Sequence, residues 1–271
     1  MVEQSEKASR FLQLHQGERP LLLPNPWDAG SAVLLGSLGF EALATTSSGS
    51  AATLGKLDGA IDREQTLASA ATIVAACELP VSADLENGFA PGADGVGETV
   101  RLALEVGLAG GSIEDYSGDD EAPIYELAEA AERVAAAAEA AHGGAGRLVL
   151  TARAENYLHG RVDLADTIAR LQAYEQAGAD VLYAPGLTEL GEIRSVVESV
   201  GLPVNVLARP GVPSVAELAS VGVARVSVGG AFAFAALGAL VTAASELRDA
   251  GTYGYFEQSK VGGKAARAAF G

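Results

Sequence analysis

The sequence predicts an α/β protein that folds as a single (β/α)₈ barrel, or TIM barrel, over residues 1–271. Eight short apolar segments alternate with eight helical segments at fairly regular spacing. The apolar segments are continuous runs, which is typical of parallel strands with both faces covered. No linker-like composition divides the chain, and its length suits a barrel of roughly 250 residues with terminal extensions.

The first half of the chain supplies four of these strands. It begins with an amphipathic helix over residues 3–16, in which Phe11, Leu12 and Leu14 lie among polar residues. Gly39 is expected to end the first barrel helix, and Asp62 to be the N-cap of the second. The strands expected here are 20–23, 40–44, 79–84 and 109–113, and the helices that follow them are 31–38, 62–78, 97–106 and 126–142.

The second half repeats this pattern and ends in a long apolar segment. The expected strands are 147–151, 180–183, 203–207 and 225–228, and the helices that follow the first three are 163–177, 190–199 and 215–220. Residues 231–271 are expected to be a helical extension, of which 231–247 is the eighth helix. An open doubly wound sheet is the alternative, but it would need a glycine-rich turn where the chain has Pro24-Asn25-Pro26-Trp27.

Composition excludes several classes of partner. The chain has 35 Asp and Glu against 18 Lys and Arg, a net charge of −17 that repels nucleic acids and anionic membranes. One cysteine, Cys77, cannot form an internal disulfide and fits a reducing cytoplasm. The polar N-terminus does not resemble a signal peptide. The longest apolar run, 231–244, is shorter than the roughly 20 residues that span a bilayer, so we expect a cytoplasmic protein.

Two carboxylates end the third strand. Asp84 and Glu86 are two residues apart, so their side chains point to the same side of a strand. Two such groups repel each other unless a proton or cation lies between them. Carboxylate oxygens suit a hard ion such as Mg²⁺ or Mn²⁺. The alternative is a pair of solvated loop acids.

Other polar residues follow other strands at the same end of the barrel, where functional groups of such folds are found. The set comprises Thr46, Ser47, Ser48, Asp84, Glu86, Glu114, Asp115, Arg153 and Glu155. This convergence favours a metal or acid–base site in which Asp84, Glu86 and Glu114 share one divalent ion.

Three further features are candidate substrate contacts. Arg153 has the geometry to bind a substrate carboxylate in a bidentate pair, although an ion pair with Glu155 or Glu86 is the structural alternative. The hydroxyl-rich loop Thr45–Ser50 would offer donors to a carboxylate, unless it is an ordinary turn. Asn205 is a polar residue within the seventh strand that would reach a ligand if it faces inward. A metal-chelated 2-oxo acid would favour an enolate, which C–C and P–C cleavage both require.

These motifs together resemble the isocitrate lyase/phosphoenolpyruvate mutase superfamily over most of the chain. The matching segments are Pro24–Gly30, Ala44–Gly49, Gly55–Asp58, Asp84–Phe89, Gly111–Asp115 and Thr151–Glu155. The resemblance implies a barrel whose last helix is exchanged between subunits, usually in a dimer of dimers.

The resemblance also implies roles for individual residues. Mg²⁺ would be bound mainly by Asp84, with Asp58, Glu86 and Glu114 acting through water. The segment Thr46, Ser47, Ser48 and Gly49 would bind the substrate together with Arg153. Asp58, Arg153 and Glu114 are therefore the expected catalytic residues.

The chain departs from the lyases of this superfamily in one loop. Where they carry Lys, Cys and His after the fourth strand, residues 116–123 contain none of these. Cys77 precedes the third strand at the opposite end of the barrel and is expected to be a small buried residue. Pro185-Gly186 stands where the lyases have Glu. Classical isocitrate lyase activity is therefore not expected.

Three functions remain open from the sequence. The first is an Mg²⁺-dependent lyase that cleaves a C–C bond of a small 2-oxo or 2-hydroxy dicarboxylate. The second is P–C chemistry, as in phosphonopyruvate hydrolase or phosphoenolpyruvate mutase, and the third is a non-catalytic 2-oxo-acid-binding protein. His15 and His142 are expected to be exposed. His159, Trp27 and Tyr183 are expected near the pocket.

Overall fold

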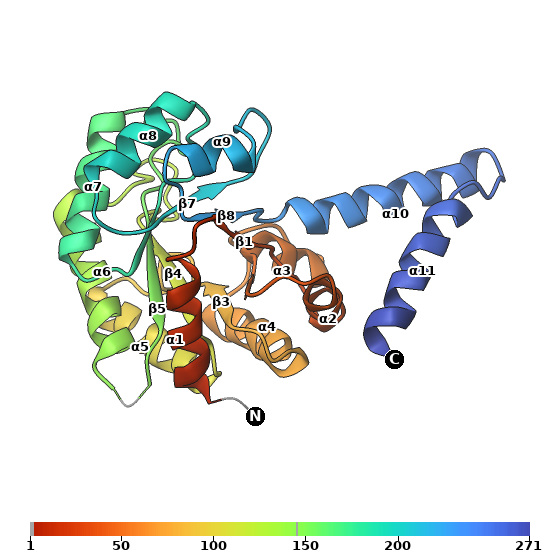
Figure 1. The fold of residues 1–271 in the computed structure, drawn as a ribbon, viewed down its shortest axis with the longest axis horizontal. Coiled ribbons are helices and arrows are strands. Elements are labelled where there is room, and N and C mark those ends of the chain that lie inside the picture. Colours follow the sequence, from red (N-terminus) through yellow and green to blue (C-terminus); the bar gives the residue numbers. More distant parts are fainter. Residues whose placement is uncertain (1–2, 145) are drawn as a thin grey trace.

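The computed structural model describes residues 3–144 and 146–271 (Figure 1). Its eight parallel strands form one sheet in the order β1-β8-β7-β6-β5-β4-β3-β2. The amide of Ala44 in β2 donates to the carbonyl of Pro24, directly after β1, so the two edge strands meet. The predicted (β/α)₈ barrel is confirmed.

The strands lie close to the predicted segments. They are β1 Leu21–Leu23, β2 Leu43–Ala44, β3 Val81–Asp84, β4 Gly110–Glu114, β5 Val149–Arg153, β6 Val181–Tyr183, β7 Val204–Leu207 and β8 Arg225–Ser227. Strand β2 begins three residues later than predicted, and β5 runs two residues further than predicted and so includes Arg153. The pairing of Glu114 with Arg153 in the β4–β5 register explains the longer β5, because the ladder continues to the rim.

The helices are α1 Gln4–Leu14, α2 Ala29–Ser37, α3 Ser47–Thr53, α4 Arg63–Ala76, α5 Ala93–Glu105, α6 Leu127–His142, α7 Leu164–Gln176, α8 Leu190–Ser199, α9 Val215–Ser220, α10 Ala231–Asp249 and α11 Phe256–Phe270. Most of the helices cover the outside of the sheet, while α1 lies at one end of the barrel and α10 and α11 lie beyond it (Figure 1). Asp62 caps α4 as predicted, by accepting a bond from the amide of Gln65.

The loop predicted at Thr45–Ser50 is wrong in part, since α3 begins at Ser47. Thr46 has an extended backbone and its side chain accepts a hydrogen bond from the Gly49 amide, which is the geometry of an N-cap. Small residues and this cap permit a short helix where sequence composition alone favoured a turn.

Helix α1 closes the amino-terminal end of the barrel. Its buried residues Ala8 and Phe11 pack against Leu21, Val149 and Val181 in a small apolar cluster. The main core lies between the sheet and the outer helices, and it contains residues such as Leu43, Leu85, Leu150, Leu182 and Tyr174. The carboxyl ends of the strands face the opposite way, which leaves that end open for a site.

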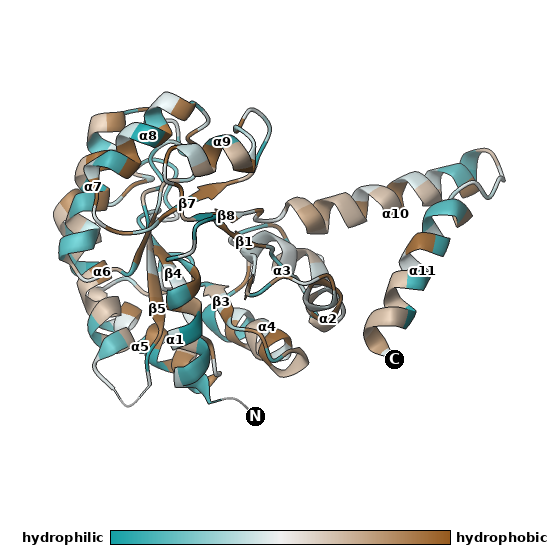
Figure 2. Cartoon of the chain, viewed as in Figure 1, coloured by the Kyte–Doolittle hydropathy of each residue, from teal (hydrophilic) through white to brown (hydrophobic). Residues whose placement is uncertain are grey.

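Helices α10 and α11 form an arm, in which α10 extends away from the barrel and α11 turns back and contacts α2 (Figure 1). Along α10 the residues are largely apolar (Figure 2), yet Phe234, Leu240 and Val241 are exposed. By length and composition α10 is the one helix of the described chain that would be able to cross a membrane, and 6% of it is buried. Residues 231–270 thus hold two helices with a turn between them.

Candidate functional site

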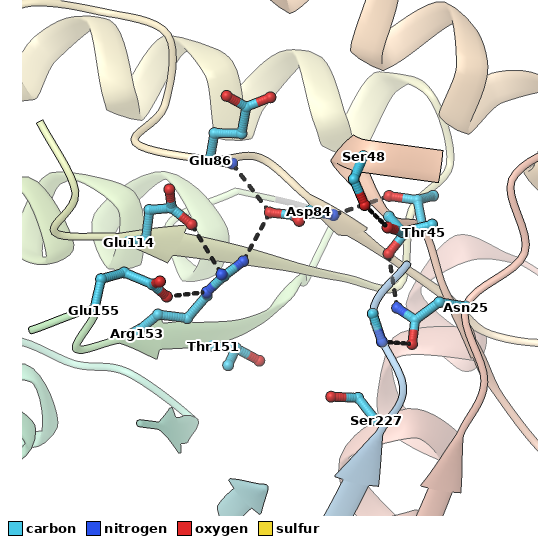
Figure 3. A network of polar contacts seen from close by, with 12 residues as sticks. Asn25, Thr45, Ser48, Asp84, Glu86, Glu114, Thr151, Arg153, Glu155 and Ser227 are labelled. Atoms are coloured by element: carbon cyan, nitrogen blue, oxygen red, sulfur yellow. Dashed lines mark hydrogen bonds and ion pairs between the residues drawn. The ribbon is translucent and has the colours of Figure 1, made fainter. Parts of the chain in front are cut away.

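Arg153 binds three carboxylates at the open end of the barrel (Figure 3). Its guanidinium lies 2.9 Å from Asp84 Oδ1, 3.1 Å from Glu114 Oε2 and 2.7 Å from Glu155 Oε1. Asp84 ends β3, Glu114 ends β4 and Arg153 ends β5, so three adjacent strands supply the cluster. The structural alternative of an ion pair holds for Glu155, whereas Glu86 makes no ion pair with Arg153 in the described chain.

Glu86 lies beside this cluster in a strained conformation. Its φ of 47° is in the left-handed region that non-glycine residues rarely adopt. Its amide donates to Asp84 Oδ1 at 3.3 Å, but its buried Oε1 has no hydrogen-bond partner within residues 3–144 and 146–271. Burial, and then the negative charges of Asp84 and Asp58, raise the pKa of Glu86 to about 8. A buried carboxylate oxygen of this kind is suited to a cation or a water on a cation.

Glu114 and Glu155, like Glu86, have too little positive charge nearby to offset their burial. Burial raises the pKa of Glu114 and that of Glu155, and Arg153 only partly offsets the effect. Four carboxylates, Asp84, Glu86, Glu114 and Glu155, thus surround one guanidinium. The cluster therefore favours an additional cation, either a proton or a metal.

Asp115, predicted from the sequence as a strand-end acid, faces away from the cluster. Its carboxylate accepts bonds from the Tyr174 hydroxyl, from Arg170 and from the amide of Glu155. This buried network fixes the backbone that carries Glu155. Arg133 plays a similar part for the loop after Glu86, because its guanidinium donates to the carbonyls of Asn87, Ala90 and Pro91.

The cluster opens onto two connected spaces. An inner cavity of about 200 Å³ lies inside the barrel, and an outer recess of about 820 Å³ lies at its mouth. Four residues, Ser47, Asp58, Arg153 and Leu158, line both. The inner cavity is smaller than typical drug-sized pockets of roughly 300–1,000 Å³, so it suits a small ligand.

The predicted substrate contacts fall into two groups. Thr46, Ser47, Ser48, Asp84, Arg153 and Asn205 line the inner cavity, and Asp58 does so as well. Gly49 does not line either space. A Cβ on Gly49 would lie 2.6 Å from Thr46 Cγ2 and 3.1 Å from Trp27 Cβ, so this glycine permits close packing. Trp27 likewise packs behind the cavity, whereas Tyr183 lines it.

Sequence reasoning missed the floor of the inner cavity. Asn25, Arg225 and Ser227 line it and were not predicted. Asn25 Nδ2 donates to the carbonyl of Thr45, and its Oδ1 accepts from the amides of Val228 and Gly229. The sequence feature that would have pointed to Arg225 is its position as the one charged residue of the predicted strand 225–228.

The prediction that His15 is exposed is wrong. It is 5% exposed, because α1 closes the barrel and directs this side chain inward. His15 Nδ1 lies 2.8 Å from the carbonyl of Phe11, and Nε2 lies 3.1 Å from Arg225 Nη1. Since an arginine only donates, Nε2 accepts and the ring is neutral with its proton on Nδ1. Burial and the charge of Arg225 lower the pKa of His15 to about 3.

The remaining minor predictions are mostly confirmed. His142 is exposed and pairs with Asp180 at 2.8 Å. His159 lines the outer recess, where it stacks on Tyr116 at 3.9 Å between ring centroids. Cys77 is half-buried at the end of α4 and packs against the core.

The residues present fit a hard divalent ion. As the side chains stand, no three of the described His, Cys, Asp or Glu residues converge closely enough to bind one, because Arg153 lies between Asp84 and Glu114. The excess of carboxylates and the partnerless Glu86 Oε1 nevertheless provide hard oxygen donors of the type that Mg²⁺ or Mn²⁺ prefers.

Fold and site together define a (β/α)₈ barrel with an acidic, charge-imbalanced site at the carboxyl ends of its strands. Comparison with known proteins agrees. The profile of the phosphoenolpyruvate phosphomutase family matches residues 11–248. A crystal structure of a lyase/mutase-type protein from Burkholderia cenocepacia J2315 is 54% identical, with a TM-score of 0.91, over 94% of this chain and 92% of that one.

Several relatives carry named activities, and two of them illustrate the range. The 2-methylisocitrate lyase of Escherichia coli K12 is 31% identical over 69% of this chain and 64% of its own length. A crystal structure of 2,3-dimethylmalate lyase is 26% identical with a TM-score of 0.84, over 98% of this chain and 99% of that one. The chain belongs to the isocitrate lyase/phosphoenolpyruvate mutase superfamily.

Proposed function

We propose that this protein is an Mg²⁺- or Mn²⁺-dependent lyase that cleaves a C–C bond of a small 2-oxo or 2-hydroxy dicarboxylate. The observation that carries the proposal is the cluster of three carboxylates that bind Arg153, with Glu86 beside them, which opens onto a small polar cavity. Similarity to 2-methylisocitrate lyase and 2,3-dimethylmalate lyase supports a dicarboxylate substrate.

The metal would be held by Asp84, Glu86 and Glu114, with Asp58 near it through water. When bound, it would supply a Lewis acid that stabilises negative charge on the oxygen of the 2-oxo group. Arg153 already neutralises part of the acidic cluster, and we expect it to turn toward the substrate carboxylate when the metal takes over that role. The hydroxyl groups of Thr46 and Ser48 and the amide of Asn205 would complete the binding site.

The proton donors and acceptors of this chain have to differ from the Lys, Cys and His that the lyases carry in the loop after the fourth strand. Residues 116–123 contain no Lys, Cys or His. Asp58 and Glu114 are the acids we expect to accept or return a proton at the substrate, since Asp58 lines both spaces and burial raises the pKa of Glu114.

The altered loop also supports the non-catalytic alternative, a 2-oxo-acid-binding protein. The match to the phosphoenolpyruvate phosphomutase profile supports the P–C alternative, in which the product would be a phosphate or a rearranged phosphonate. Both alternatives use the same metal site. The P–C alternative differs from the main proposal in the product of turnover, and the binding protein would have no turnover.

A second part of the proposal concerns assembly. The arm formed by α10 and α11 exposes Phe234, Leu240 and Val241, although such residues are usually buried. We propose that a second copy of this chain covers the arm, in a homodimer or a dimer of dimers. The net charge of −17 and the single Cys77 support a cytoplasmic location with neither membrane nor nucleic acid as partner.

A turnover screen tests the proposed reaction. Oxaloacetate, 2-methylisocitrate, 2,3-dimethylmalate, isocitrate and phosphonopyruvate would be supplied with and without Mg²⁺, and carbonyl products and phosphate would be measured separately. We expect Mg²⁺-dependent cleavage of a C–C bond that Asp84→Asn abolishes. Asp94→Asn, a change of an exposed acid on α5, is the matched control. Phosphate release would establish P–C chemistry, and metal-dependent binding without turnover would establish the binding protein.

Light scattering tests the proposed assembly. Wild type should have the mass of at least two chains, and Leu240→Glu on α10 should reduce it to one. Val162→Glu, at a position that is 70% exposed and outside the arm, should leave the mass unchanged. A monomeric wild type would overturn the proposed assembly.

A further inference from the structure

Arg225 lies at the floor of the inner cavity and has no acidic partner. It begins β8, is 4% exposed and donates to three neutral acceptors. Nε is 2.9 Å from Asn205 Oδ1, Nη1 is 3.1 Å from His15 Nε2, and Nη2 is 3.1 Å from Thr151 Oγ1. Within the described chain no Asp or Glu forms an ion pair with it.

A buried cation without a counter-ion is costly, since an isolated buried charge is stabilised far less than a hydrated one. A purely structural arginine would gain from a neighbouring acid, and this chain has 35 acids. Yet the acidic side chains that line the inner cavity are Asp58 and Asp84, and neither pairs with Arg225 in the described chain. The positive charge is thus left for something that enters the cavity.

Arg225 also fixes how its neighbours face the cavity. Because a guanidinium has only donors, the amide oxygen of Asn205 must face it, so Asn205 Nδ2 points to Ser227 Oγ at 2.9 Å. Asn205 then keeps a second N–H for the cavity. The hydroxyl of Thr151 accepts from Arg225 behind the residues that line the cavity, and so helps to hold the guanidinium in place. The floor therefore presents donors.

The two ends of the site thus have opposite polarity. The outer recess is lined by Asp58, Glu86, Glu114, Asp120 and Glu155, with Arg153 as its one arginine or lysine among the described residues. In Figure 3, Glu86 lies at one end of the group and Ser227 at the other, with Arg153 between them. A ligand with a metal-chelating end and a second anionic end matches this arrangement.

We infer that Arg225, with Asn205 and Ser227, forms a subsite for the remote carboxylate of the substrate at the floor of the inner cavity. Arg225 is a positioning residue there, because it supplies charge and orients the donors that contact the carboxylate. The inference deepens the proposed function and rests on it, since it assigns the second carboxylate of the dicarboxylate. Arg153 is already paired with three carboxylates, so its charge attracts an anion at the floor of the cavity less strongly than the charge of Arg225 does.

The test compares two ligands that differ only in the charge of the remote group, malate and its 4-amide. Binding would be measured by calorimetry with Mg²⁺ present. Wild type should bind malate at least tenfold more tightly than the amide. Arg225→Gln, which keeps hydrogen-bonding capacity but loses the charge, should bring the ratio close to one and leave the affinity for the amide within twofold.

Two further variants secure the result. Arg209→Gln removes an exposed arginine after β7 and should retain the wild-type ratio. Asn205→Asp gives Arg225 an acidic partner of the same shape, so the chain should fold, and malate should again lose its advantage. Asn205→Asp answers the question if Arg225→Gln does not fold.

The outcomes separate the subsite from the proposed function. A preference for malate that persists in Arg225→Gln or Asn205→Asp would overturn the subsite, as would an equal loss of both ligands. A wild type that turns over a dicarboxylate but binds malate and the amide equally would overturn the subsite alone. A wild type that neither binds these ligands nor turns over any dicarboxylate would overturn both.

Discussion

Two buried arginines inside one barrel have opposite surroundings. Arg153 at the end of β5 pairs with three carboxylates, whereas Arg225 at the start of β8 pairs with none in the part of the chain that the structure describes. Charge of the neighbouring acids raises the pKa of Arg153, whereas burial and then the charge of Arg153 lower the pKa of Arg225 to about 10. Both remain protonated at pH 7, so the difference lies in how much of each charge is already neutralised.

This difference indicates that the end of the site at Arg153 needs a further cation and that the end at Arg225 needs an anion. Around Arg153 the acids outnumber the cations, so a metal ion or protons would balance the charge. Around Arg225 the neutral acceptors leave a positive charge unbalanced, so a ligand carboxylate would balance it. One dicarboxylate held between a metal and Arg225 would satisfy both ends.

The largest expected effect is on turnover at the acidic end. Asp84→Asn should lower kcat by about a thousandfold or more, because a bound metal and its oriented charge contribute several kcal/mol to transition-state stabilisation. Steady-state kinetics at saturating Mg²⁺ measure this. Activity within tenfold of wild type would show that Asp84 is not the main metal ligand.

The next effect is on stability and compares the two arginines directly. Arg153→Met leaves three buried acids without their cation and should lower the free energy of unfolding by about 3–5 kcal/mol. Arg225→Met removes a charge that has no partner and should cost less, about 1–3 kcal/mol, for the acceptors left unpaired. Urea unfolding at pH 7 without metal measures both. Equal losses would contradict the proposed difference in charge balance.

An effect similar in size to that of Arg225→Met tests the neutral partners of Arg225. Thr151→Val keeps the shape but removes an acceptor of a charged donor, and should cost about 1.5–3 kcal/mol. Thr66→Val is the matched control, because Thr66 Oγ1 is buried with no partner in the part of the chain that the structure describes. The control should be neutral or stabilising in the same urea experiment. A loss at Thr66 as large as that at Thr151 would remove the support for this bond.

The smallest effect concerns His15 and pH. Its pKa is about 3 in the folded chain and about 6.5 when unfolded, so between these values the unfolded state binds more protons. Its contribution to stability is complete above pH 6.5 and is lost as the pH falls toward 3. The slope is at most about 1.4 kcal/mol per pH unit.

His15→Gln should reduce the slope of unfolding free energy against pH between about 4 and 6, while variants elsewhere keep it. The comparison with wild type in one buffer series isolates this residue from the acids of the site. An unchanged slope would mean that His15 is protonated in the folded protein, and hence that Arg225 has a different partner.

The sequence by itself determined the fold, the family and the acidic end of the site. The alternation of apolar strands and helices is local information, and the motifs around Asp84, Glu114 and Arg153 come directly after strands whose ends must meet in a parallel barrel. The sequence also pointed to Asn205, because a polar side chain within an apolar strand needs a hydrogen-bond partner, such as a ligand, if it faces inward.

Only the tertiary structure decided what those residues do to one another. Whether Arg153 is paired, whether Glu86 Oε1 is partnerless and whether Thr46 caps a helix depend on positions across several strands. His15 and Arg225 are 210 residues apart in the chain and meet inside the barrel. His15 is four residues after Phe11 and therefore lies on the same face of α1, but the sequence alone does not show that this face closes the barrel, so the polar side chain was expected to be exposed. Charge balance is a property of this three-dimensional neighbourhood, and it is the balance around the two arginines that points to the ligand.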